Sequence, residues 1–125
     1  MTSRTAVAIV TTSLLLAGTV GIDAGEKLTV MVSPNVSSAP STVVVRALIP
    51  KESGNRWLHI GADSGSFYRS SEIQLDGENA PLVTEVRLKN LPSGEYTVVV
   101  VLRDHLGHQT TVRSNVVVLS RFGEP

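Results

Sequence analysis

Asp104, His105 and His108 lie within five consecutive residues and form the closest grouping of metal-capable side chains in the sequence. Two imidazoles and one carboxylate are ligands that copper or zinc accepts. The same segment also has the composition of an exposed hairpin turn, because Asp104 can bond its own nearby backbone and Gly107 tolerates a positive φ. We interpret the segment as a turn, keep a metal site as the alternative, and predict no resident cofactor.

Other residue types that could do catalysis do not form a recognisable motif. Serines are frequent, but the chain has no G-x-S-x-G segment, and its three histidines have no obvious catalytic partner. Most acidic residues fall in expected turns, where Asp bonds its own backbone. The chain also has no P-loop, no G-x-G-x-x-G and no EF-hand loop. We therefore predict that the protein is not an enzyme.

Trp57 and His59 are the candidate binding residues, and the strand that contains them decides how they can act. Residues 56–62 read RWLHIGA, in which Leu58 and Ile60 alternate with Trp57 and His59. Alternation places Leu58 and Ile60 toward a core and the other two on the outer face. Large aromatic residues are mostly buried, so we favour a buried or half-buried Trp57. An exposed Trp57 beside His59 would instead form an interaction patch.

Length and composition describe one globular domain, with 125 residues of which 42% are hydrophobic. Lysine and arginine number 11, as do aspartate and glutamate, which argues against a nucleic-acid binder or a polybasic membrane-surface protein. Aromatic residues make up only 4%, which disfavours a platform for stacking bases or sugars. Because the chain has no cysteine, disulfides and thiolate chemistry are excluded.

The first 24 residues have the pattern of a secretory signal peptide. Arg4 supplies the positive charge, residues 6–17 form an apolar segment, and small residues follow up to Ala24. We expect cleavage near Ala24, so that residues 25–125 form the domain. Cleavage after Gly21 and retention as an uncleaved anchor are the alternatives. The product is predicted to be secreted or periplasmic, with no membrane insertion after cleavage.

The rest of the chain alternates short apolar segments with turn residues, which is typical of a β-sandwich. No part of it shows a helical period. Residues 33–41, rich in serine and proline, are expected to form a loop. About seven strands are expected, at residues 27–32, 42–49, 56–62, 67–75, 82–88, 96–103 and 115–119, with residues 109–111 resuming the sheet after a turn at 104–107. Residues 67–75 form either one strand or two short edge strands.

Residues 91–119 read as a β-hairpin with the turn that leads into it. They follow the pattern L-x-x-G-x-Y-x-V-x-V-x-x-x-D-x-x-G, made by Leu91, Gly94, Tyr96, Val98, Val100, Asp104 and Gly107. This pattern resembles the last two strands of immunoglobulin-like sandwiches, including fibronectin type III and PKD-type bacterial extracytoplasmic modules. The resemblance implies an all-β, immunoglobulin-like antiparallel sandwich. It also implies that Tyr96, at the corner position, bonds back to upstream backbone.

The hairpin is also similar to that of periplasmic copper-resistance carrier proteins, which are immunoglobulin-like too. The matching run is YTV from Tyr96 followed by DHLGH from Asp104. That family has a histidine at the mature amino terminus, whereas this chain has none between Met1 and Leu58, and it has no Met-rich segment.

These features predict an exported, non-enzymatic immunoglobulin-like domain that acts as a protein-interaction or adhesion module of the cell envelope. The expected partner is another envelope or extracellular protein, and not nucleic acid. Two alternatives stay open. One is a periplasmic copper-binding protein that uses residues 104–108, and the other is an accessory subunit of a larger envelope enzyme.

Overall fold

The computed structural model describes residues 27–121 and shows an all-β chain, as predicted from the sequence. The described strands are β2 (Thr29–Ser33), β3 (Val36–Ser38), β4 (Ser41–Leu48), β5 (Asn55–Asp63), β6 (Tyr68–Gln74), β7 (Val83–Leu91), β8 (Gly94–Asp104) and β9 (Gln109–Leu119). One short 3-10 helix, η2 (Gly77–Asn79), begins directly after Asp76. Of the two alternatives for residues 67–75, one strand or two short ones, the structure has one, because β6 is unbroken.

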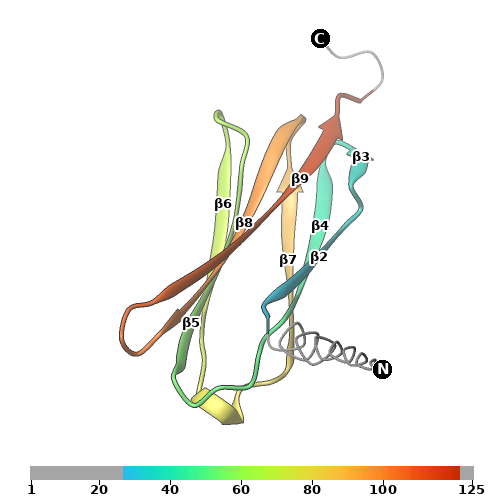
Figure 1. Cartoon of the computed structure of the whole chain (residues 1–125). Coiled ribbons are helices and arrows are strands. Elements are labelled where there is room, and N and C mark those ends of the chain that lie inside the picture. The colour runs from blue at the N-terminus through green and yellow to red at the C-terminus, as the bar shows by residue number, and fades with distance from the viewer. Residues whose placement is uncertain (1–26, 122–125) are drawn as a thin grey trace, which may run out of the picture.

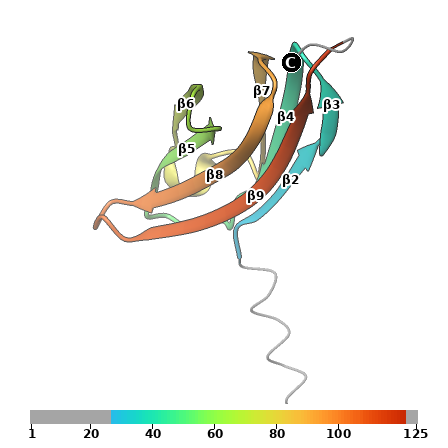
Figure 2. The ribbon, with the colours of Figure 1, turned by 90° about the horizontal axis from the view of Figure 1, so that it is seen from above.

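The strands form two sheets that face each other as a sandwich (Figure 1). The smaller sheet has the order β2-β4-β7, and the larger sheet has the order β3-β9-β8-β5-β6. All neighbours pair antiparallel except β3 and β9, which run parallel. Seen from above, β8 and β9 sweep in a curve around one side of the sandwich (Figure 2). The prediction of an antiparallel β-sandwich is confirmed.

The expectation of a plain loop over residues 33–41 is wrong, because this segment contains β3. The backbone N–H of Val117 donates to the carbonyl of Asn35 at 2.8 Å, and the N–H of Ala39 donates to Leu119 at 2.9 Å. These bonds attach β3 to the free edge of β9. Three residues are too few to show a strand period, so the pairing depends on a partner that is distant in the sequence.

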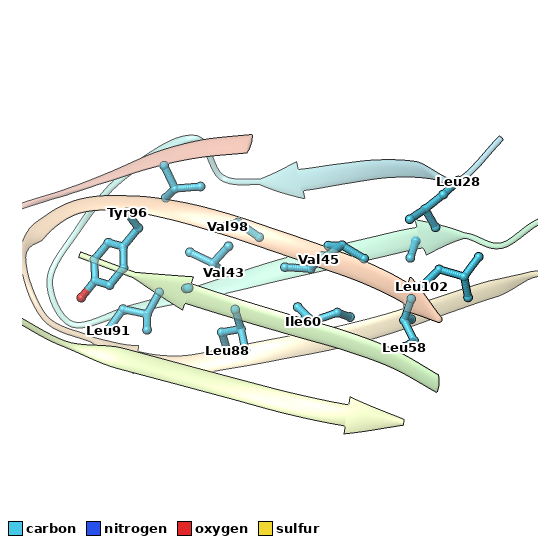
Figure 3. Close-up of a cluster of buried hydrophobic side chains, with 14 of the residues drawn as sticks. Leu28, Val43, Val45, Leu58, Ile60, Leu88, Leu91, Tyr96, Val98 and Leu102 are labelled. Carbon is cyan, nitrogen blue, oxygen red and sulfur yellow. The ribbon is translucent and has the colours of Figure 1, made fainter. Parts of the chain in front are cut away.

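The core lies between the sheets and is made mainly by the inward-facing positions of β4, β5, β7, β8 and β9 (Figure 3). The alternation predicted for residues 56–62 is confirmed, because Leu58 and Ile60 of β5 are fully buried. Val98 and Val100 of β8 are buried as well. Val43 and Val45 of β4 meet them from the opposite sheet. β-branched residues dominate here because they fit a pleated, covered surface with little loss of side-chain freedom.

Strand β7 runs three residues further than predicted, to Leu91. Asn90 has φ of 61°, and the pairing of β7 with β4 shifts register between Ser41 and Val43. This irregularity breaks the two-residue alternation, so that Leu88 and Leu91, three positions apart, are both buried. Asn is one of the few residues besides Gly that adopts this backbone conformation at low cost.

The hairpin of β8 and β9 is longer and more regular than the sequence indicated. β9 is continuous from Gln109 to Leu119, whereas residues 112–114 in its middle were not expected in a strand. Arg113 pairs with Val99 and Asn115 pairs with Thr97, on the outer face of the sheet. Polar side chains are compatible with a strand there because that face is not covered.

The expected signal peptide, residues 1–24, lies outside the described residues. Within residues 27–121, no helix has the length and apolar character needed to cross a membrane.

Candidate binding surface

Trp57 lies on the outer face of the larger sheet and is 37% exposed. The ring is therefore only partly exposed, in line with the favoured expectation of a buried or half-buried side chain, and it lies on the outer side that the alternation of residues 56–62 predicted. The physical reason is that a strand allows only two faces, and the buried Leu58 and Ile60 take the inner one. Part of an apolar ring is left in contact with solvent as a result, which is a feature of interaction surfaces.

Strand pairing sets the neighbours of Trp57. On one side it pairs with Gln74 of β6, and on the other with Arg103 of β8. In the next row, His59 pairs with Glu72 of β6 and with Val101 of β8. The outer face thus brings together side chains from three strands, which we call the Trp57 face: Trp57, His59, Tyr68, Glu72, Val101 and Arg103.

His59 is fixed by two side chains of the edge strand β6. Its Nε2 lies 3.1 Å from the hydroxyl of Tyr68, in a hydrogen bond whose direction depends on the ring tautomer. Its Nδ1 lies 3.4 Å from Oε2 of Glu72. The imidazole is therefore held in one orientation, and the carboxylate of Glu72 is directed toward it rather than toward Arg103.

Tyr68 is a member of this face that sequence analysis missed. It is 56% exposed, yet its ring leans over β5 to reach His59. Gly61 makes the approach possible, because a Cβ at that position would lie 3.0 Å from the Tyr68 hydroxyl and 3.3 Å from Nε2 of His59. Only the pairing of β5 with β6 places these residues together, so no local pattern could have identified Tyr68.

Two hollows border Trp57. The smaller has a volume of about 150 Å³ and is lined by Trp57, His59, Glu72, Val101 and Arg103. The larger has a volume of about 540 Å³ and is lined by Arg56, Trp57, Gln74, Leu75 and Asp76. The exposed ring thus stands between two depressions whose walls carry both hydrogen-bond donors and acceptors. A shape of this kind can receive side chains of another molecule.

The two arginines beside Trp57, Arg56 and Arg103, differ in whether they already have hydrogen-bond partners within the chain. The guanidinium of Arg56 donates to the backbone carbonyls of Ser53 and Asn55, at 2.7 and 2.8 Å. Within residues 27–121, Arg103 forms no ion pair or side-chain hydrogen bond. Arg103 is therefore a cation of this face that stays available to a ligand.

The segment from Asp104 to His108 is the tight turn between β8 and β9. Oδ1 of Asp104 accepts the backbone N–H groups of Leu106 and His108, both at 2.9 Å, and its Oδ2 lies 3.3 Å from Nδ1 of His108. Desolvation raises the pKa of Asp104, but these bonds from His108 and Leu106 outweigh it and hold the pKa below its ordinary value. The carboxylate thus has a structural role in closing the turn.

His105 is directed elsewhere. Its backbone N–H donates to Gly54 at 2.8 Å, and its ring packs against the same glycine. The structure thus brings Asp104 and His108 together but leaves His105 apart, and no three metal-ligating side chains converge among the described residues. The alternative of a copper site at residues 104–108 gains no support from this geometry.

Comparisons with known proteins identify the fold. The sequence matches no protein-family model, and no curated protein matches it. Among solved structures, superoxide reductase (neelaredoxin) from Ignicoccus hospitalis is 15% identical, covering 74% of this chain and 80% of that one with a TM-score of 0.58. A mutant of the corresponding Archaeoglobus fulgidus protein, in the reduced form, is 12% identical over 73% and 89%, with a TM-score of 0.50. Murine CRIg is 12% identical over 77% and 99%, with a TM-score of 0.43.

At this level of identity the first two likenesses show a shared fold and nothing of the activity, and the third has too low a score to carry an argument. Fold and function are separable, because unrelated sites are built on the same sandwich. The function of this chain therefore has to be argued from its own surface.

Proposed function

We propose that this protein is an exported, non-enzymatic immunoglobulin-like domain, of the fibronectin type III or PKD kind, that binds another protein of the cell envelope through the Trp57 face. The observation that carries the proposal is the 37% exposure of Trp57 on the outer face of the five-stranded sheet. Trp is enriched among the residues that dominate protein interfaces, and the exposed part of this ring does not contribute to packing of the core. The amino-terminal signal pattern supports export.

The immunoglobulin-like part of the proposal rests on topology. The chain pairs β2, β4 and β7 in one sheet and β9, β8, β5 and β6 in the other, with its first strand split so that β3 joins the second sheet. Sandwiches of the immunoglobulin type divide consecutive strands between two sheets in this manner. Such domains present loops or a sheet surface to their partners, which fits an interaction or adhesion module better than a catalyst.

The test is capture of a partner from envelope extract, with the exported chain, residues 25–125, as bait. We expect the wild-type chain to retain a specific protein that Trp57→Ala does not retain. Met31→Ala is the matched control, because Met31 is 50% exposed on the smaller sheet. Thermal unfolding of both variants confirms that they are folded.

Three other results of the capture experiment would point to different interpretations. Equal capture by wild type and Trp57→Ala would exclude the Trp57 face as the binding surface. Capture that disappears with a chelator would favour the metal site at residues 104–108 instead. A captured partner that proves to be an envelope enzyme would identify the chain as its accessory subunit.

A further inference from the structure

The smaller hollow beside Trp57 contains opposite charges that are unequally engaged. Glu72 and His59 face each other, with 3.4 Å between Oε2 and Nδ1, whereas Arg103 has no ion-pair partner among residues 27–121. Arg103, on the neighbouring strand β8, pairs with Trp57, so the two residues lie in the same row of the sheet. A ligand that enters this hollow therefore meets an apolar ring and an unpaired cation side by side.

Other charged residues near Trp57 lie outside the smaller hollow, and two of them, Arg56 and Asp76, line the larger one. Asp63 and Glu95 are at the opposite end of the sheet, and Oδ1 of Asp63 accepts the backbone N–H of Gly65 at 2.8 Å. Arg113 pairs with Val99, four positions before Arg103 on β8. The positive charge at Trp57 is thus local, and it selects a ligand group rather than attracting any acidic protein from a distance.

We propose that the partner of the Trp57 face supplies a carboxylate side chain, from Asp or Glu of an exposed peptide segment, to the guanidinium of Arg103, while an apolar residue next to that carboxylate packs on the ring of Trp57. This inference rests on the proposed function and names the chemistry of its partner. Guanidinium and carboxylate groups match in a planar, two-bond arrangement that a lysine cannot reproduce. The pair is partly shielded by the hollow, and Trp and Arg are two of the residue types that contribute most to interface affinity.

Charge complementarity favours this ligand over the alternatives. A basic or neutral apolar segment would leave Arg103 desolvated and unpaired against the ring, which costs binding free energy. A carboxylate restores the hydrogen bonds that the guanidinium loses to water. His59 completes the wall of the hollow, and its bond to Tyr68 keeps the ring from turning away from β6.

The test is selection of a random peptide library, displayed on phage, on the protein purified from the periplasm after export of the full chain. Peptides that also bind Trp57→Ala are removed by counter-selection. We expect the remaining peptides to be enriched in Asp or Glu next to an apolar residue. A synthetic consensus peptide should lose affinity by about tenfold or more when Arg103 becomes Gln, since one charge-assisted pair is lost.

Matched variants separate charge from geometry. Arg113→Gln removes an arginine from the same outer face and should leave the affinity of the peptide within about twofold, because it lies outside the hollow. Arg103→Lys keeps the charge but not the planar fork, and it should lose part of the affinity. Replacing the acidic residue of the peptide by its amide should cost as much as Arg103→Gln and add little in combination.

The failures are distinguishable. Peptides that require Trp57 but contain no acidic residue, or that bind Arg103→Gln as tightly as wild type, would overturn the carboxylate inference and leave the Trp57 face in place as a binding surface. Recovery of no peptide that discriminates Trp57→Ala from wild type would count against both the surface and its acidic ligand.

Discussion

The hydroxyl of Tyr96 donates a hydrogen bond to the backbone carbonyl of Pro92 at a distance of 2.7 Å. This bond closes the corner where the chain leaves β7 and enters β8, so the role that the sequence resemblance implied for Tyr96 is confirmed. The ring is 2% exposed and meets Phe67 edge to face, with 6.5 Å between the ring centroids. Burial of the ring also raises the pKa of Tyr96.

Tyr96→Phe should lower the free energy of unfolding by roughly 1 kcal/mol, because the substitution leaves the carbonyl of Pro92 without its side-chain donor while the apolar ring remains. Urea denaturation measures the difference. Tyr68→Phe is the matched control, since its hydroxyl is on the exposed face, and its midpoint should shift less. An unchanged midpoint for Tyr96→Phe would show that the corner bond contributes nothing to stability.

Gly77→Ala should destabilise the fold by roughly 2–4 kcal/mol, which combines the left-handed backbone with a steric clash. Gly77 has φ of 53°, and a Cβ there would lie 2.7 Å from the carbonyl oxygen of Ser53. Gly107→Ala is the comparison, because Gly107 has φ of 89° and a Cβ added to it would meet no atom within 4 Å. Thermal unfolding should therefore show a larger loss at Gly77, and equal losses would contradict the steric part of the explanation.

Asp104→Asn should change how stability depends on pH. The pKa of Asp104 lies below its ordinary value of 3.8, so its ionised form stabilises the fold above that pH, and the contribution is lost as the pH falls through the folded pKa. Asn keeps the acceptor oxygen for Leu106 and His108 but cannot ionise. The stability difference between wild type and variant, measured by urea denaturation, should therefore shrink from neutral pH to pH below 3.8.

The same direction of pH dependence is expected for the stability contribution of a second carboxylate, Glu85. Bonding to Arg46, at 2.8 Å, lowers the pKa of Glu85 on the outer face of the smaller sheet. The difference in the free energy of unfolding between Glu85→Gln and wild type should thus also shrink in acid. A stability difference that is independent of pH for both variants would rule out ionisation as the source of the effect.

The double variant His105→Ala with His108→Ala should change the free energy of unfolding by no more than about 0.5 kcal/mol, because both rings are exposed. The backbone N–H of His108, and not its ring, makes the 2.9 Å bond to Asp104, and that bond survives the substitution. Differential scanning calorimetry with and without added copper provides the measurement. A large loss, or a copper-dependent rise in the wild-type midpoint that the variant lacks, would revive the metal interpretation of this turn.

Local patterning was sufficient for the strands that alternate strongly. In β5, Leu58 and Ile60 share the buried face, and the period of two predicted this directly. It was not sufficient for β3 or for the middle of β9, because those residues form strands only through their pairing with a neighbouring strand. Asn90 in β7 shows the same limit, since its positive φ follows from the bulge against β4.

The candidate site divides in the same way. Alternation placed Trp57 and His59 on the outer face, although the general tendency of tryptophan to be buried pointed the other way. Tyr68 and Arg103 joined them only through pairing of β5 with β6 and with β8. Residues on different strands have no sequence signal of contact when each strand alone is compatible with several partners.

By itself, the sequence determined the all-β class, the main strands, the inward side of β5, and the turn at residues 104–108, because period and turn chemistry are local properties of the chain. Only the tertiary structure decided which strands are neighbours, and with that the composition of the Trp57 face and the separation of His105 from Asp104 and His108. Strand order depends on burial of the whole apolar set between two sheets, which is a property of the complete fold and not of any one segment.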